Sequence, residues 1–173
     1  AARICDHLGC KLTASLVDKF SDGEIRVEMG DNVRGDDVYV VQSTCAPVNH
    51  NLMELCLMLD ALKRASAGRV TAVVPYLCYA RSDKKDQPRV PITARLVADM
   101  IEVAGADRYI VYDLHSKQIQ GFFSIPGDVL SGYHILKPYL ASKLHEMHNP
   151  VVLTADLGFA KGGRRYAQSL NLP

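Results

Sequence analysis

The sequence predicts an α/β fold with a mainly parallel sheet flanked by helices. Short apolar runs rich in β-branched residues alternate along the chain with longer stretches of helical periodicity, and this alternation is typical of βαβ units. The chain has 173 residues, of which 48% are hydrophobic and 23% are charged. Such a length and composition suit one globular domain with a buried core rather than a disordered or fibrous protein.

The expected strands differ in their pattern of apolar residues. Ile25, Val27 and Met29 alternate with Arg26 and Glu28, which is the period of a strand buried on one face. The other runs are more continuously apolar, as in strands that are covered on both faces. They span residues 37–42, 69–74, 108–113 and 151–154.

Helices are expected between these strands, and suitable capping residues lie at their ends. Asn51 can begin a helix over residues 51–67 that Gly68 ends, and Gly105 follows an amphipathic helix over residues 93–104. The remaining helices are expected over residues 1–8, 133–147 and 159–170.

Charge and cysteine content argue against several classes of protein. Lys and Arg total 20 against 19 Asp and Glu, so the net charge is +1, and no electrostatic argument favours a nucleic-acid or membrane partner. The five cysteines form no C-x-x-C pair, which argues against a zinc ribbon and a disulfide framework. No apolar run approaches the roughly 18 residues of a membrane helix, and the first residues lack a signal-peptide core. We therefore expect a cytoplasmic protein with reduced thiols.

In a parallel α/β sheet, ligands bind beyond the carboxyl ends of the strands. The residues just past the expected strand ends are 42–44, 76–83, 113–115 and 156–158. Asp113 and His115 follow one strand with a single residue between them, so both side chains are expected on the same side of the chain. Such a pair can bind a metal or move a proton, or it can hydrogen-bond and pack within its own loop. Asp156, one βα unit later, leaves the same two readings open.

Positive charge is concentrated in one of these loops. Arg81, Lys84 and Lys85 lie within five residues of one another. Fixed positive charge beside a strand end suits a polyphosphate ligand, although a solvated loop is the more common fate of a charge cluster. Residues 20–24 have the composition of a hairpin turn. The sequence has neither the G-x-x-x-x-G-K-[ST] loop of a P-loop kinase nor a G-x-G-x-x-G dinucleotide fingerprint.

Several segments carry a family resemblance when they are taken together and in order. The longest is DLHSKQIQGFFSIPGD at residues 113–128. The others are FSDGE (20–24), NVRG (32–35), QSTCAPVNHNLMEL (42–55), DALKRASAGRVTAVVPY (60–76) and YARSD (79–83). Together they resemble the family of ribose-phosphate pyrophosphokinases over essentially the whole chain, and the longest is similar throughout to the family's metal-binding segment.

The resemblance implies a phosphoribosyltransferase-like fold with a protruding β-hairpin around residues 20–24. In this family the hairpin reaches the ATP site of a neighbouring subunit, where Phe20 would help to flank the adenine. Arg81 resembles the family's contact with the ATP phosphates, and Ser82 stands where family members usually have Gln. The ATP-binding residues that the resemblance implies are Phe20, Asp22, Gly23, Glu24, Arg81, Ser82 and Asp83.

The resemblance also implies Mg²⁺ as the cofactor that accompanies ATP. His115 looks like a catalytic residue and metal ligand, Asp156 like a second metal-site carboxylate, and Asp113 like a residue that orients the metal loop without binding the ion. The implied reaction transfers the pyrophosphoryl group of MgATP to the anomeric hydroxyl of ribose 5-phosphate and releases AMP. Its physical requirements are in-line positioning and neutralisation of charge.

Residues 1–173 are expected to form the N-terminal domain of a longer chain, without its opening strand and its C-terminal catalytic domain, and to be inactive alone. Family members assemble as homo-oligomers, commonly hexamers, and phosphate and ADP regulate many of them. Three alternatives stay open: a non-catalytic regulatory subunit associated with the synthetase, a phosphoribosyltransferase, and a stand-alone ATP-binding module. Arg81, Asp83 and His115 argue against the first, because such subunits tend to lose the metal-binding His and the Arg loop.

Overall fold

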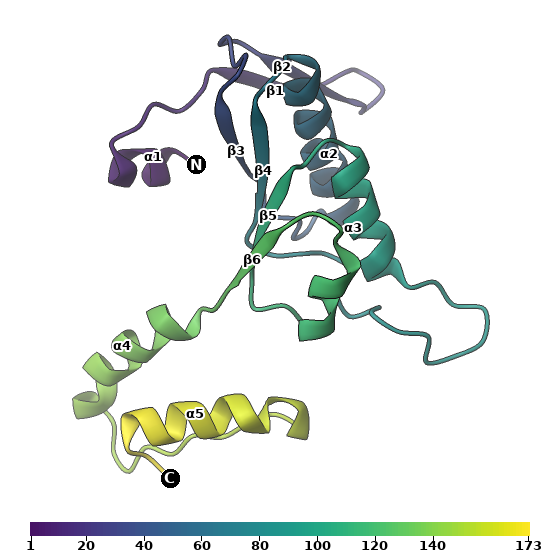
Figure 1. The fold of residues 1–173 in the computed structure, drawn as a ribbon. Coiled ribbons are helices and arrows are strands. Elements are labelled where there is room, and N and C mark those ends of the chain that lie inside the picture. Colours follow the sequence, from purple (N-terminus) through teal and green to yellow (C-terminus); the bar gives the residue numbers. More distant parts are fainter. The chain divides into compact units, whose positions relative to one another are not determined.

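The computed structural model describes all 173 residues, which divide into two compact units, Ala1–Leu130 and Ser131–Pro173. The first unit contains a four-stranded sheet, a separate two-stranded hairpin and several helices, of which the first lies apart from both sheets (Figure 1). The second unit consists of helices and connecting loops. None of the helices combines the length and the apolar composition that a membrane span requires.

The sheet of the first unit is fully parallel, with the strand order β3-β4-β5-β6. Helix α2 joins β3 to β4, helix α3 joins β4 to β5, and the 3-10 helix η1 joins β5 to β6. Because crossovers between parallel strands are right-handed, α2 and α3 lie beside each other on one face of the sheet (Figure 1). The elements are β3 (Asp37–Val41), α2 (Val48–Arg64), β4 (Arg69–Val74), α3 (Thr93–Val103), β5 (Arg108–Tyr112), η1 (Lys117–Phe122) and β6 (Gly127–Leu130).

This arrangement confirms the expected α/β class and most of its elements. Helix α2 begins at Val48, three residues before the expected Asn51. Strand β6 and helix η1 were not predicted, because their short segments show neither a clear period of two nor a full helical turn pattern. The core between the sheet and its helices contains fully buried aliphatic side chains from every layer, among them Leu55, Leu59, Val70, Val74, Val97, Ile101, Val111 and Ile119.

A hairpin and a short helix complete the first unit. Strands β1 (Ser15–Lys19) and β2 (Ile25–Met29) pair in antiparallel fashion, and α1 (Ala2–Leu8) precedes them. The turn closes with a hydrogen bond from the Phe20 amide to the Glu24 carbonyl at 2.8 Å, and Gly23 adopts φ 94°. A positive φ at this turn position favours glycine. The expected hairpin around residues 20–24 is therefore confirmed.

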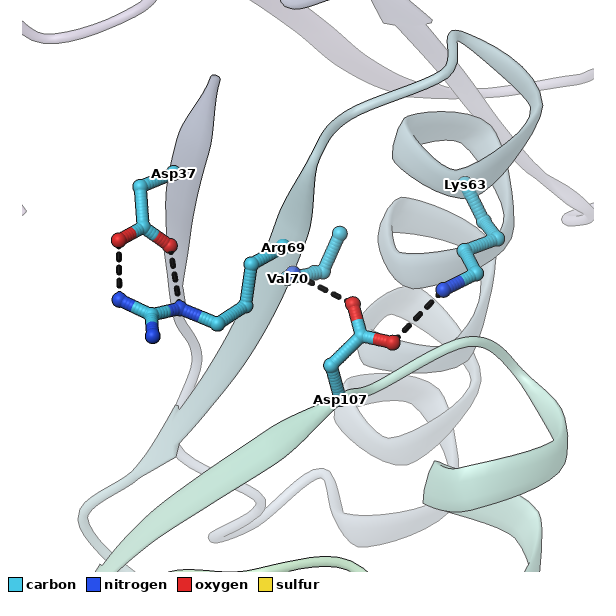
Figure 2. A network of polar contacts seen from close by, with 5 residues as sticks. All are labelled: Asp37, Lys63, Arg69, Val70 and Asp107. Atoms are coloured by element: carbon cyan, nitrogen blue, oxygen red, sulfur yellow. Dashed lines mark hydrogen bonds and ion pairs between the residues drawn. The ribbon is translucent and has the colours of Figure 1, made fainter. Parts of the chain in front are cut away.

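Charged side chains are paired at the edge of the sheet where the strands begin. Asp37 of β3 and Arg69 of β4 are register partners and form a bidentate ion pair. Figure 2 shows the Asp107 carboxylate between two donors, the Val70 amide at 2.8 Å and Lys63 Nζ at 2.7 Å. Burial opposes ionisation of Asp107, but these two hydrogen bonds outweigh it and lower the pKa of its carboxyl. The network joins α2, β4 and the start of β5.

The second unit corrects one expected strand. Its helical elements are α4 (Tyr133–Lys143), η2 (Leu144–Glu146), η3 (Leu157–Phe159) and α5 (Ala160–Leu170). Residues 151–154 are not a strand, although their composition favours one. A strand needs a neighbour to receive its backbone hydrogen bonds, and no other strand lies in this unit. One backbone bond, from Val152 to the Pro173 carbonyl at 3.0 Å, holds the segment, and Leu153 is 90% exposed.

Candidate functional site

A cavity of the first unit lies where the strands of the parallel sheet end. Parallel strands bring their carboxyl ends to one edge, so the loops that follow β3, β4 and β5 meet there. The cavity has a volume of about 950 Å³, and residues 47–50, 76–82 and 112–115 line it. It is therefore built from three loops and the first turn of α2, on the side of the sheet that lies opposite the Asp37–Arg69 pair.

The loop after β4 is the longest wall of this cavity, and Thr44 fastens it. The Thr44 hydroxyl donates to the Tyr76 carbonyl at 2.7 Å and accepts from the Cys78 amide at 2.8 Å. Further along, Tyr79 has a left-handed φ of 56° and its hydroxyl donates to Asn49 Oδ1 at 2.5 Å. Burial raises the pKa of the Cys78 thiol, and the hydrogen bond with Thr44 offsets part of that rise. The wall is thus a fixed structure rather than a loose surface loop.

Arg81 and Ser82 are the last residues of this wall. Arg81 is exposed, and its guanidinium forms no hydrogen bond or ion pair with the protein. Ser82 instead bonds to the far end of its own loop: its hydroxyl donates to the Pro91 carbonyl at 3.3 Å and accepts from the Thr93 amide at 3.4 Å. These bonds place Ser82 at the N-terminus of α3 and close the neck of the charged loop, residues 83–91. Asp83 lies in that loop, just outside the cavity lining.

The opposite wall is the loop after β5. Asp113 and His115 both line the cavity and both are exposed to it. Asp113 has a φ of 39°, and its amide donates to the Leu130 carbonyl of β6 at 2.9 Å. A left-handed conformation costs energy for a residue with a Cβ and is found preferentially at functional sites. The His115 imidazole has no hydrogen-bond partner within the protein, so both of its nitrogens are available to a ligand.

The structure brings four of the predicted site residues to one cavity: Arg81, Ser82, Asp113 and His115. Phe20, Asp22, Gly23 and Glu24 lie instead at the tip of the hairpin and do not line the cavity. The Asp22 carboxylate accepts from the Glu24 amide at 3.0 Å, while the Phe20 ring is exposed.

Asp156 belongs to the second unit, where its carboxylate accepts from the Phe159 amide at 3.1 Å and caps η3. The predicted strand that would have placed it at a sheet edge is absent. Its expected position therefore lacks the geometric basis that the sequence suggested.

Three residues of the site carry roles that the sequence did not reveal. Thr44, Asn49 and Tyr79 hold the cavity wall. The sequence marked Thr44 and Tyr79 only by their position after predicted strands, and it did not mark Asn49 in this way. Thr44 lies among the residues that follow β3, and Tyr79 among those that follow β4. A side-chain role of this kind depends on which loops become neighbours, and a sequence pattern does not contain that information.

The donor groups fit a magnesium ion only if the ion arrives with its own ligands. No group of three or more His, Cys, Asp or Glu side chains forms a ready-made cage in the structure. Mg²⁺ usually keeps several waters and takes one or two protein ligands beside substrate phosphates. His115 can supply such a small share as a single protein ligand, so the cavity fits a metal that a polyphosphate carries in.

A parallel α/β domain with an anion-compatible cavity at the carboxyl edge of its sheet is thus the class of protein that the fold and site define. Residues 1–105 match the family described as the N-terminal domain of ribose phosphate pyrophosphokinase. The chain belongs to this family.

Curated relatives and a solved structure extend the match to the whole chain. The ribose-phosphate pyrophosphokinase of Wolinella succinogenes is 51% identical over 169 residues, and that of Caldanaerobacter subterraneus subsp. tengcongensis is 53% identical over 174 residues. These alignments cover 98% and 100% of this chain and 54% of each relative. The crystal structure of phosphoribosylpyrophosphate synthetase from Mycobacterium smegmatis superposes with a TM-score of 0.93 at 43% identity, covering 99% of this chain and 58% of that one. The chain therefore spans about half the length of the proteins that it matches.

Proposed function

We propose that this chain is the N-terminal half of a ribose-phosphate diphosphokinase. The intact polypeptide would transfer pyrophosphate from MgATP to the anomeric hydroxyl of ribose 5-phosphate, giving phosphoribosyl pyrophosphate and AMP. The observation that carries the proposal is the 51 to 53% identity to ribose-phosphate pyrophosphokinases along essentially the whole chain. Retention of Arg81 and His115 in one cavity favours a catalytic subunit over a non-catalytic regulatory one.

Within this proposal the cavity binds the ATP phosphates. Arg81 is a cation without a protein partner, and a guanidinium is well suited to bind phosphate through two parallel hydrogen bonds. Ser82 and Asp83 stand at the neck of the charged loop and would hold its position beside the nucleotide.

His115 is the proposed catalytic residue and metal ligand, with Asp156 as a second metal-site carboxylate and Asp113 as the residue that orients the His115 loop. When bound, Mg²⁺ would neutralise negative charge on the phosphates during transfer. The hydrogen bond that the Asp113 amide donates to β6 fixes the start of this loop. His115 would then contact the phosphates or the ion through either ring nitrogen. Support for Asp156 comes from the family resemblance alone.

The hairpin residues Phe20, Asp22, Gly23 and Glu24 would complete the nucleotide site of a neighbouring subunit. The exposed Phe20 ring is suited to stacking on an adenine. This role requires a homo-oligomer, and we propose that it is a hexamer. We also propose that phosphate and ADP regulate the enzyme and that it is cytoplasmic. Family membership supports these proposals.

The proposed function predicts that the intact polypeptide forms AMP from ATP only when ribose 5-phosphate is present. His115→Ala should lower the rate by about a hundredfold or more, because removal of one transition-state contact commonly has that effect. His145→Ala is the matched control, since His145 is an exposed histidine of the second unit, and it should leave the rate unchanged.

Release of AMP without the sugar would identify an ATP-hydrolysing activity instead. Binding of MgATP with no turnover by the intact protein would favour the regulatory subunit. An active His115→Ala variant would remove the catalytic role from this residue.

A further inference from the structure

Thr44 is a buried residue beside the site that does not itself line the cavity. Its side chain is 0% exposed, and all of its neighbours in the hydrogen-bond network lie on the loop after β4. The hydroxyl donates to the Tyr76 carbonyl at 2.7 Å and accepts from the Cys78 amide at 2.8 Å, while the Thr44 amide also donates to Tyr76 at 3.1 Å. One residue thereby joins loops that are more than thirty positions apart.

These bonds act on a segment that is under backbone strain. Cys78 is followed directly by Tyr79, whose φ of 56° is unfavourable for a residue with a Cβ. Such a conformation persists only where the surroundings hold it. Thr44 holds Cys78, the residue before Tyr79. After Tyr79, the Ser82 amide donates to the Tyr79 carbonyl at 3.0 Å. Arg81 lies between these two anchors, so its backbone direction depends on both.

We infer that Thr44 is a positioning residue of the nucleotide site: its buried hydroxyl fixes the backbone of residues 76–78 and thereby directs Arg81 toward the phosphates. The inference rests on the proposed function, because it takes MgATP as the ligand of the cavity. It goes further by assigning affinity for that ligand to a side chain that does not touch it. A hydrogen bond inside a site of low dielectric is stronger than one in water, which suits the hydroxyl to this role.

The chain offers a matched control in Thr71 of β4. Thr71 is 1% exposed, and its hydroxyl has no hydrogen-bond partner. Replacing either threonine with valine preserves shape, but only Thr44→Val removes hydrogen bonds. Thr44→Ser keeps the hydroxyl and removes only the methyl group. The three variants therefore separate the effect of the hydroxyl from that of buried volume.

The test measures KM for MgATP, KM for ribose 5-phosphate and kcat on the intact polypeptide and its variants. We expect Thr44→Val to raise KM for MgATP about tenfold, because an unpaired buried amide is left at Cys78 and the loop loosens. kcat and KM for ribose 5-phosphate should stay within about twofold of wild type. Thr44→Ser and Thr71→Val should both keep a KM for MgATP close to that of wild type.

The inference is overturned if Thr44→Val leaves KM for MgATP unchanged, or if Thr44→Ser is as impaired as Thr44→Val. Should Thr44→Val fail to fold, Thr44→Ser against Thr44→Ala gives the same comparison of a side chain with and without the hydroxyl. Hydrogen exchange at the Cys78 amide gives a reading that does not need the substrate. It should rise about tenfold in Thr44→Val or Thr44→Ala and not in Thr71→Val; an unchanged rate contradicts the inference. An inactive wild type with this exchange pattern would refute the proposed function and leave only the loop-fixing role.

Discussion

Charged and polar side chains are paired where the strands of the parallel sheet begin, but not where the strands end. Where the strands begin, Asp37 pairs with Arg69, and Asp107 accepts from both Lys63 and the Val70 amide (Figure 2). Where the strands end, Arg81 and His115 line a cavity, and neither side chain has a hydrogen-bond partner in the protein. The backbone around them is nevertheless fixed.

This difference separates structural charge from functional charge. Paired groups at the first edge stabilise the fold, whereas the unpaired guanidinium of Arg81 and imidazole of His115 at the second edge are available to a ligand. Binding sites commonly contain unpaired or strained groups that are locally unfavourable, and the rest of the fold compensates for their cost. The comparison predicts that substitutions at the first edge change stability and those at the second edge change ligand affinity.

The largest stability effect at the first edge is expected for Asp107→Ala. The substitution removes the acceptor of the Val70 amide, and Val70 is fully buried, so the free energy of unfolding should fall by about 1–3 kcal/mol. Asp99→Ala is the control, because its ion pair with Arg95 is solvent-exposed and contributes about 0.5 kcal/mol. Chemical denaturation measures both values. Equal effects would show that the network is only a surface ion pair.

A smaller effect concerns pH. The pKa of Asp107 lies below its ordinary value of 3.8, so its carboxylate contributes stability above pH 3.8, and this contribution is lost as pH falls through the lowered pKa. Asp107→Asn cannot titrate. The difference in unfolding free energy between wild type and Asp107→Asn should therefore be constant near neutral pH and shrink below pH 3.8. A difference that persists unchanged into that acidic range would contradict the paired state of Asp107.

Local patterns predicted most of the first unit. The alternation of Ile25, Val27 and Met29 and the apolar run 69–74 identified β2 and β4, because burial of one or both faces leaves a direct trace in the sequence. Strand β1 was missed, since all five of its residues are exposed and no burial pattern distinguishes it. The segment 151–154 shows the opposite error. Its composition favours a strand, but strand formation requires a partner that the unit does not supply.

The candidate site was predictable only in part. Asp113 and His115 follow a strong strand, so the rule that ligands bind at carboxyl ends placed them correctly in the cavity. The role of Thr44 was hidden because it depends on contact with Cys78, thirty-four residues away. Family resemblance, rather than spacing, assigned Phe20 and Asp156, and neither assignment follows from the geometry of a single chain.

The measurement that tests the central claim most directly is the affinity of the intact polypeptide for MgATP, in wild type and in Arg81→Ala. If the carboxyl edge binds the nucleotide phosphates, Arg81→Ala should weaken binding by about tenfold or more. Arg64→Ala, which removes an exposed arginine that pairs with Asp60 on α2, should bind as wild type does. Calorimetry on the three proteins gives the result. Equal affinity of Arg81→Ala and wild type would show that the phosphates bind elsewhere and that this cavity is not the nucleotide site.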